Sequence, residues 1–137
     1  MKTIGLIGGM SWESTTSYYK LLNEGVKAKL GGLHSAKIIL YSVDFAPIAR
    51  LQNEGNWEEA ALIIKEAALS LQRAGADFIL ICSNTIHKVT SQIVSMIQIP
   101  VVHIADATAE KLNIEFLPLL DTTDERKHRE YLFNYFY

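Results

Sequence analysis

The chain is poor in cysteine and proline and has no excess of positive charge. It carries one cysteine and three prolines in 137 residues. A single cysteine excludes an intramolecular disulfide, so a reducing cytoplasm is the expected compartment. The formal net charge is −2, and the 13 Lys and Arg residues are scattered along the chain, which argues against a nucleic-acid partner. No apolar run is long enough to cross a bilayer, so a membrane role is not expected either.

Two further signals are missing near the N-terminus. Glycines and then Trp12 interrupt the first apolar run before it reaches the length of a secretory signal, so we expect a cytoplasmic protein that is not exported. Gly8 and Gly9 fit neither the dinucleotide-binding GxGxxG pattern nor the P-loop pattern. Nucleotide binding is therefore disfavoured.

Four short apolar runs stand out in a chain of ordinary globular composition. Apolar residues make up 49% and charged residues 20%, and the length is that of one domain. The runs are rich in Ile and Val and end at turn residues; they cover residues 2–7, 37–41, 77–81 and 101–104. Strands that are apolar throughout are typical of a parallel sheet buried on both faces.

Helical spacing of apolar residues separates these runs. It predicts helices over residues 13–30, 57–74 and about 85–97, and a short one that ends near Leu112 and is capped by Asp106 or Thr108. Pro47 is expected to end the second strand, which leaves Gln52 in a loop. The alternation predicts an α/β fold, a doubly wound, Rossmann-like parallel sheet of about four strands with helices on both faces.

In such a sheet, ligands bind beyond the carboxyl ends of the strands. The segments that follow the four predicted strands are residues 8–11, 42–45, 82–85 and 103–106. We expect these segments to converge at one edge of the sheet.

Cys82 is the sharpest functional candidate among them. It ends a buried run and precedes a predicted helix, so free N–H groups and the helix dipole would favour its thiolate as a base or nucleophile. The alternative is a buried cysteine that behaves as a small apolar residue. Asn84 and Thr85 either hold a ligand carboxylate or cap the next helix.

Other residues near the strand ends have structural explanations beside the functional ones. Gly8 and Gly9 either cradle an anion or permit a tight turn. His87 either lowers the pKa of Cys82 or simply lies in solvent or in helix packing. Asp44 is interpreted as a turn residue rather than an acid–base group. His34 and His103 are too dispersed to form a zinc site with Cys82, so no metal is expected.

Several segments together resemble one enzyme family. They are M-K-T-I-G-L-I-G-G-M-S-W-E-S-T at the start, G-G-L-H-S-A at 31–36, S-V-D-F at 42–45, L-Q-R-A-G-A-D at 71–77, C-S-N-T-I-H-K-V at 82–89 and H-I-A-D-A-T at 103–108. In this order they resemble the aspartate/glutamate racemase family, in particular its bacterial amino-acid racemase branch, over residues 1 to about 112.

The resemblance implies a cofactor-independent racemase that uses two cysteines. One thiolate removes the α-proton of an amino acid, and a second cysteine in another domain returns a proton to the opposite face. Cys82 matches the first of these bases. Ser83, Asn84 and Thr85 match groups that bind the substrate carboxylate or amine, and the positions of Met10 and Gln52 match pocket-lining residues.

The chain departs from this family in length and in its second base. Family members are nearly twice as long, and their second cysteine, in a G-C-T-E-like motif, has no counterpart here. We therefore expect a racemase-like domain over residues 1–112 and a short tail over 113–137 that resembles the start of a second domain. The aromatic end, Y-L-F-N-Y-F-Y, is expected to pack on a core or a partner.

Three functional hypotheses follow. The first is an amino-acid racemase acting on aspartate, glutamate or a similar small amino acid, without metal or cofactor. The second is a truncated, non-catalytic racemase-like domain that binds a small acid weakly or serves as a dimerisation module. The third is a related isomerase or lyase that needs one cysteine. A homodimer is expected, with no nucleic-acid or membrane partner.

Overall fold

The structure, a computed structural model, describes residues 1–115. Its elements, in chain order, are β1 (Ile4–Gly8), α1 (Trp12–Leu30), β2 (Ile38–Ser42), α2 (Phe45–Asn53), α3 (Trp57–Arg73), β3 (Phe78–Ile81), the 3-10 helix η1 (Thr85–Val89), α4 (Thr90–Val94), β4 (Val101–Val102) and α5 (Ile104–Glu115). The four strands form one parallel sheet in the order β2-β1-β3-β4. The predicted doubly wound α/β fold is confirmed.

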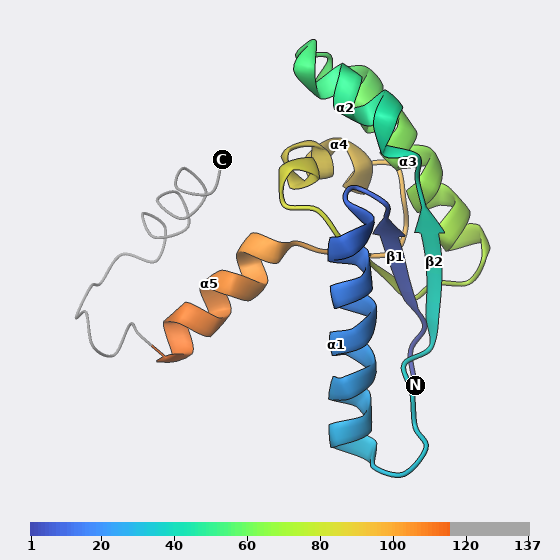
Figure 1. Cartoon of the computed structure of the whole chain (residues 1–137), viewed down its shortest axis with the longest axis vertical. Helices are drawn as coiled ribbons and strands as arrows, with labels where there is room; N and C mark the ends of the chain where they lie inside the picture. Colours follow the sequence, from blue (N-terminus) through green and yellow to red (C-terminus); the bar gives the residue numbers. More distant parts are fainter. Residues whose placement is uncertain (116–137) are drawn as a thin grey trace.

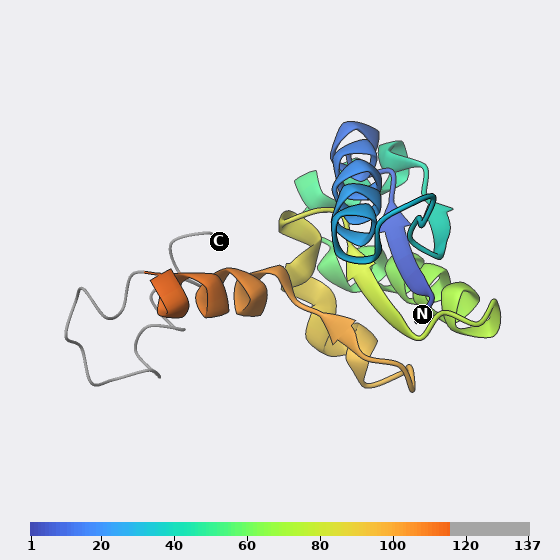
Figure 2. The same cartoon turned by 90° about the horizontal axis from the view of Figure 1, so that it is seen from below.

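Helices cover the two faces of the sheet unequally. Figures 1 and 2 show α1 on one face and α3 on the other, with α2 and α4 on the α3 side. Along β1 and β3 the side chains alternate, so that Ile7 and Ile81 join the larger core under α3, whereas Leu6 points toward α1. Thr15 is the one buried residue of α1, so the α1 side is the thinner of the two layers.

One helix was not predicted from the sequence. α2 begins directly after β2, with the carboxylate of Asp44 accepting a hydrogen bond from the Ala46 amide at 3.2 Å. Pro47 lies in the first turn of this helix, where a missing N–H breaks no helical hydrogen bond. The prediction that Gln52 lies in a loop was therefore wrong, since it belongs to α2.

The segment after β3 also differs from its prediction. A single helix over residues 85–97 was expected, but the chain forms η1 and then the short helix α4. The ring of His87 reaches back to the Ser83 carbonyl at 2.7 Å, which holds the first turn in a tight conformation.

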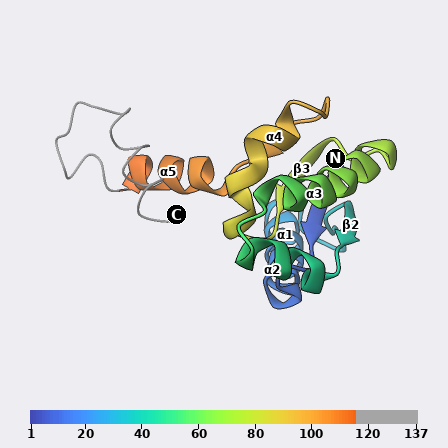
Figure 3. The same ribbon diagram turned by 90° about the horizontal axis from the view of Figure 1, so that it is seen from above.

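The last described helix, α5, starts at Ile104, earlier than expected. Neither Asp106 nor Thr108 caps it, because the ring nitrogen Nδ1 of His103 accepts from the Ala105 amide at 3.1 Å. α5 extends away from the sheet (Figures 1 and 3). The predicted boundary at residue 112 falls inside this helix, and most of the predicted 113–137 tail lies outside the described residues, so the domain division stays a prediction. None of the helices within residues 1–115 is long and apolar enough to span a membrane.

Candidate functional site

The strand order creates one point at which a ligand crevice is expected. β1 lies in the middle of the sheet between β2 and β3, and the chain leaves β1 into α1 on one face but leaves β3 into η1 on the other. Such a switch point, at the carboxyl ends of adjacent parallel strands, is where doubly wound folds bind ligands. Residues just after Gly8 and Ile81 border it, so the predicted convergence of the segments starting at Gly8 and Cys82 follows from the topology.

Cys82 continues β3 by one residue. Its amide donates a 2.9 Å hydrogen bond to the Ile7 carbonyl of β1, and its side chain is 0% exposed. The thiol packs with Ile4 and Leu6 on the α1 face of the sheet, beside Tyr18. It is therefore held by a neighbouring strand and covered by a helix.

The prediction that a helix N-terminus favours the thiolate of Cys82 was wrong for this conformation. Burial raises the pKa of the thiol from its ordinary value of 9.0 to about 12, so the group is a neutral thiol at physiological pH. The expected helix N-terminus does not reverse this effect, since η1 starts only at Thr85 and is a single short 3-10 segment. Apolar neighbours, rather than a dipole, decide the charge state.

Tyr18 is a neighbour of Cys82 that sequence reasoning missed. Burial and, to a smaller degree, the charge of an ionised Cys82 raise the pKa of its phenol. The spacing of Thr15, Tyr18 and Leu22 along α1 places them on one helical face, which was the available signal that this face meets the sheet.

The three residues after Cys82 form a more open edge. Ser83 is half-buried, and its carbonyl accepts from the ring of His87. Asn84 and Thr85 are exposed, and the Asn84 carbonyl accepts from the His87 amide at 3.0 Å. The side chain of Asn84 does not cap η1, so the capping alternative for this residue does not hold.

The other two residues matched to a pocket lie elsewhere. Met10 is buried in the core on the α3 side, packed in the same cluster as Ile48. Gln52 is half-buried in α2, which packs on α3. The side chain of Met10 and the thiol of Cys82 thus belong to core clusters on opposite faces of the sheet.

The two glycines after β1 serve a tight turn. A Cβ on Gly8 would overlap the side chain of Thr15, and one on Gly9, which has φ +96°, would overlap the backbone of Val43. The Gly9 amide donates to the Thr15 hydroxyl at 2.9 Å, whereas Ser11, at the N-cap position of α1, makes no capping hydrogen bond with its side chain. The need for a tight turn accounts for both glycines. The Gly9 amide, which an anion would need as a donor, is already bonded to Thr15.

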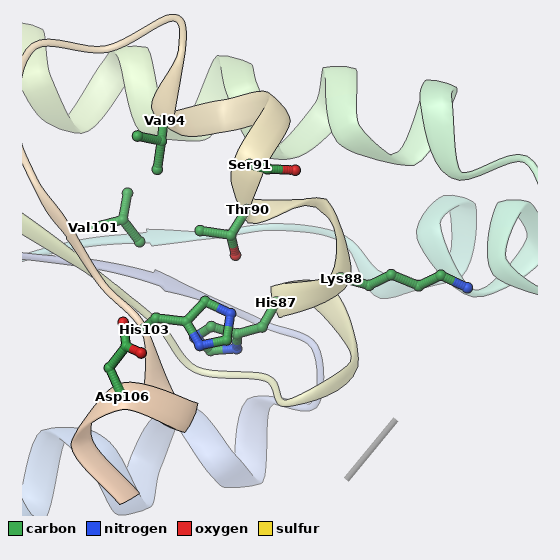
Figure 4. A pocket seen from close by; sticks show the side chains of 8 residues that line it. All are labelled: His87, Lys88, Thr90, Ser91, Val94, Val101, His103 and Asp106. Atoms are coloured by element: carbon green, nitrogen blue, oxygen red, sulfur yellow. The ribbon is translucent and has the colours of Figure 1, made fainter. Parts of the chain in front are cut away.

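A pocket of about 500 Å³ is lined by residues of η1, α4, β4 and the start of α5, and Cys82 is not among them. Figure 4 shows the rings of His87 and His103 at one end of it, with α4 on one side and the start of α5 on the other. The ring centroids are 4.5 Å apart in an edge-to-face arrangement. Burial, together with His103, lowers the pKa of His87, although its hydrogen bonds to Ser83 and Asn84 oppose the shift. Sequence reasoning treated these two histidines separately because their contact is tertiary.

Metal binding gains no support from the side chains in this region. Within the part of the chain that the structure describes, no three His, Cys, Asp or Glu residues are arranged to hold a metal ion. The His87 ring is moreover engaged at both nitrogens, by the Ser83 carbonyl and by the Ile104 amide.

Comparison with known proteins gives a consistent family assignment. The family model described as Asp/Glu/hydantoin racemase matches residues 7–114. A protein from Yersinia pestis assigned as an Asp/Glu racemase has a similar solved structure, with 56% identity, a TM-score of 0.82 and coverage of 84% of this chain. An aspartate racemase homologue from Pyrococcus horikoshii is 37% identical over 85% of this chain, with a TM-score of 0.78. The aspartate racemase of Picrophilus torridus, at 22% identity and a TM-score of 0.70, shares the fold.

Each match covers most of this chain but only about half of the solved structure. This chain covers 50% of the Yersinia and Pyrococcus proteins and 49% of the Picrophilus protein. It therefore spans about half the length of the solved structures that it matches.

Proposed function

The chain belongs to the Asp/Glu/hydantoin racemase family, and we propose that it acts at the α-carbon of a small acidic amino acid with Cys82 as an acid–base group. One observation carries the proposal: Cys82 directly follows β3 beside the switch point of the sheet and precedes the polar segment 83–85. The names of the matched family and structures support aspartate or glutamate as the substrate.

The proposed step is a proton transfer that needs no cofactor. The Cys82 thiolate takes the α-proton and becomes a thiol, and the electron pair left on Cα spreads into the substrate carboxylate. Donors at that carboxylate lower the barrier because they stabilise the developing charge. Ser83, Asn84 and Thr85 are the proposed donors.

In the conformation described, the buried Cys82 is suited to donating a proton rather than to removing one. A thiol with a pKa of about 12 is protonated at neutral pH, which is the form that gives a proton to a carbanion. Abstraction needs the thiolate, so we propose that substrate binding moves segment 82–85 or α1 and brings polar groups to the sulfur. The closed state described here precedes that movement.

Inversion of the α-carbon needs a second proton donor on the opposite face of the substrate. Cys82 is the one cysteine of these 137 residues, so a second thiol must lie outside them. We propose a homodimer, in which a second copy completes the site. Support comes from the thin α1 side of the sheet, where Leu21, Leu40 and Val102 are exposed.

The burial of Cys82 also favours a second candidate function, that of a non-catalytic binding domain. If Cys82 stays a covered, neutral thiol, the chain is a non-catalytic domain that binds a small acid through residues 83–85. The two candidates differ in one measurable property, because only the first exchanges the α-proton of the bound amino acid with water.

Incubation of L-aspartate or L-glutamate with the protein in deuterated water tests the proposal. Deuterium at Cα with inversion supports a complete two-base site, and deuterium with retained configuration supports a half-site. Absence of deuterium, together with equal binding by wild type and Cys82→Ala, favours the non-catalytic candidate.

A further inference from the structure

His87 occupies a structurally central position that the proposed chemistry leaves unused. It is 3% exposed and lies in η1, five residues after Cys82. Its Nδ1 is 2.7 Å from the Ser83 carbonyl oxygen, and its Nε2 is 3.3 Å from the Ile104 amide. A carbonyl only accepts and an amide N–H only donates, so Nδ1 carries the hydrogen and Nε2 carries the lone pair. The ring is neutral, and each of its two nitrogens makes a hydrogen bond.

The two contacts join separate parts of the chain. Ser83 is the neighbour of Cys82, at the end of β3, whereas Ile104 is the first residue of α5, beyond β4. His103 packs against the ring at 4.5 Å and orders the same junction, because its own Nδ1 accepts from the Ala105 amide. The imidazole of His87 is thus a bridge between the candidate catalytic loop and the start of α5.

We propose that His87 is a positioning residue, whose two hydrogen bonds tie the segment Cys82–Thr85 to the start of α5 and thereby keep the Cys82 thiol covered. The inference rests on the proposed function in one respect: it gives this coupling a role in the opening of the site. The coupling itself does not depend on catalysis. In this account a displacement of α5 releases the loop, and a fixed α5 holds it closed.

The surroundings of the bridge leave room for such a displacement. The 500 Å³ pocket lies between α4 and the start of α5, and it is lined by His87, His103 and Asp106 among others (Figure 4). Thr90 borders it with a buried hydroxyl that, among the described residues, has no hydrogen-bond partner. Because this side of the bridge is open rather than packed, the start of α5 can move toward α4 without displacing core side chains.

The thiol of Cys82 reports the state of the loop directly, since the chain contains no other cysteine. Iodoacetamide modifies the thiol only when segment 82–85 opens, when α1 moves off the sheet or when the whole protein unfolds. The variants below leave α1 unchanged, so a difference between them reports the opening of the segment. Measurement of the rate at several low urea concentrations separates these routes, because global unfolding accelerates with urea and a small local opening does not.

Substitution of Ile104 tests the bridge without changing His87. Ile104→Pro removes the N–H that donates to Nε2, and proline is tolerated at the first position of a helix. Ile104→Ala is the matched control, because it removes side-chain atoms but keeps the N–H. We expect alkylation of Cys82 in Ile104→Pro to be about fivefold faster than in Ile104→Ala, the effect of losing one hydrogen bond of average net strength.

Two variants at His87 separate its contacts. His87→Asn places an amide donor near the Nδ1 position, and His87→Gln places an amide oxygen near the Nε2 position. We expect His87→Gln to give the faster alkylation, because it loses the direct tie to Ser83, and His34→Gln, on an exposed residue, to match wild type.

The proposal is overturned if Ile104→Pro and Ile104→Ala are alkylated at the same urea-independent rate. It is also overturned if every increase follows the urea dependence of global unfolding. Alkylation that responds as expected, in a protein that exchanges no α-proton, would retain the positioning role and reject the proposed catalysis. Exchange of the α-proton, together with alkylation rates that do not differ between the variants, would retain the proposed catalysis and reject the positioning role.

Discussion

The amide of Cys82 donates a 2.9 Å hydrogen bond to the carbonyl of Ile7, so the candidate acid–base residue is held by the middle strand of the sheet. This bond fixes the backbone, and strand alternation then turns the thiol toward α1 rather than toward solvent. The position of Cys82 and its burial therefore have one cause, the extension of the β1–β3 ladder by one residue.

The first prediction concerns the reactivity of this thiol. A pKa of about 12 instead of 9.0 lowers the thiolate fraction at pH 7 about 1000-fold. We expect native wild-type protein to react with iodoacetamide at least that much more slowly than the same protein unfolded in urea. A titration midpoint for alkylation below pH 9 would contradict the burial argument.

The pKa of Cys82 also has a consequence for stability. The folded state holds the proton to a higher pH than the unfolded chain does, so the contribution is present below pH 9.0 and is lost as pH rises toward 12. Unfolding free energies measured between about pH 8 and pH 10 should therefore fall less steeply in Cys82→Ala than in wild type.

The second prediction contrasts two glycines. Gly8→Ala places a methyl group against Thr15, and we expect a loss of about 1–3 kcal/mol in the free energy of unfolding. Gly25 lies in α1 with open space around it, so Gly25→Ala should stabilise by about 0.5–1 kcal/mol. Urea denaturation measures both. Addition of Thr15→Ala to Gly8→Ala should recover part of the loss, and no recovery would show that the clash lies elsewhere.

The third prediction is a pH dependence caused by His87. Burial and the facing His103 hold its pKa below the ordinary value of 6.5, against the opposing effect of the Ser83 carbonyl. The unfolded chain binds the proton first as pH falls, so the contribution of the neutral ring is present above pH 6.5 and is lost below it. Among the described residues, the other ionisable groups at the same pocket are Lys88, whose ammonium lies over Trp57, and Asp106 on α5.

Unfolding free energies between about pH 7.5 and pH 5.5 check this prediction. The decrease on acidification should be smaller in His87→Gln than in wild type, and His34→Gln serves as the exposed control. Equal slopes in all three proteins would remove His87 as the cause.

Much of the fold could be predicted from the sequence, because the buried strands are continuous apolar runs and the turns carry glycines. Two features could not. α2 was missed because Pro47 was interpreted as a strand end, although a proline in the first turn of a helix breaks no hydrogen bond. The covered state of Cys82 depends on Tyr18 and Leu22 of α1 packing against the cluster that holds Cys82, which is a tertiary contact.

The candidate site likewise has a part that could be predicted from the sequence and a part that could not. The strand end at Cys82 and the polar residues after it follow from local pattern, and the structure places them at the switch point of the sheet. The bridge from His87 to Ile104 spans residues 17 apart in sequence and depends on how β4 pairs with β3. No periodicity or motif encodes such a contact.

The fourth prediction concerns oligomeric state. Light scattering with size exclusion should give about twice the 15.4 kDa mass of one chain. Val102→Lys, on the α1 side of the sheet, should shift the protein to a monomer, because a charge on that face opposes its burial. Leu62→Lys is the control, since Leu62 is equally an exposed apolar residue but lies on α3. A wild-type monomer would reject the homodimer.

The central claim, that Cys82 transfers the α-proton of an amino acid, is tested most directly by proton NMR of L-aspartate in deuterated water. Wild type, Cys82→Ser and Cys82→Ala are compared at equal concentration. The account predicts loss of the α-proton signal with wild type and at least about a hundredfold slower loss with both variants, the scale of removing one acid–base group. Equal rates in the three proteins, or no loss with wild type, would contradict it.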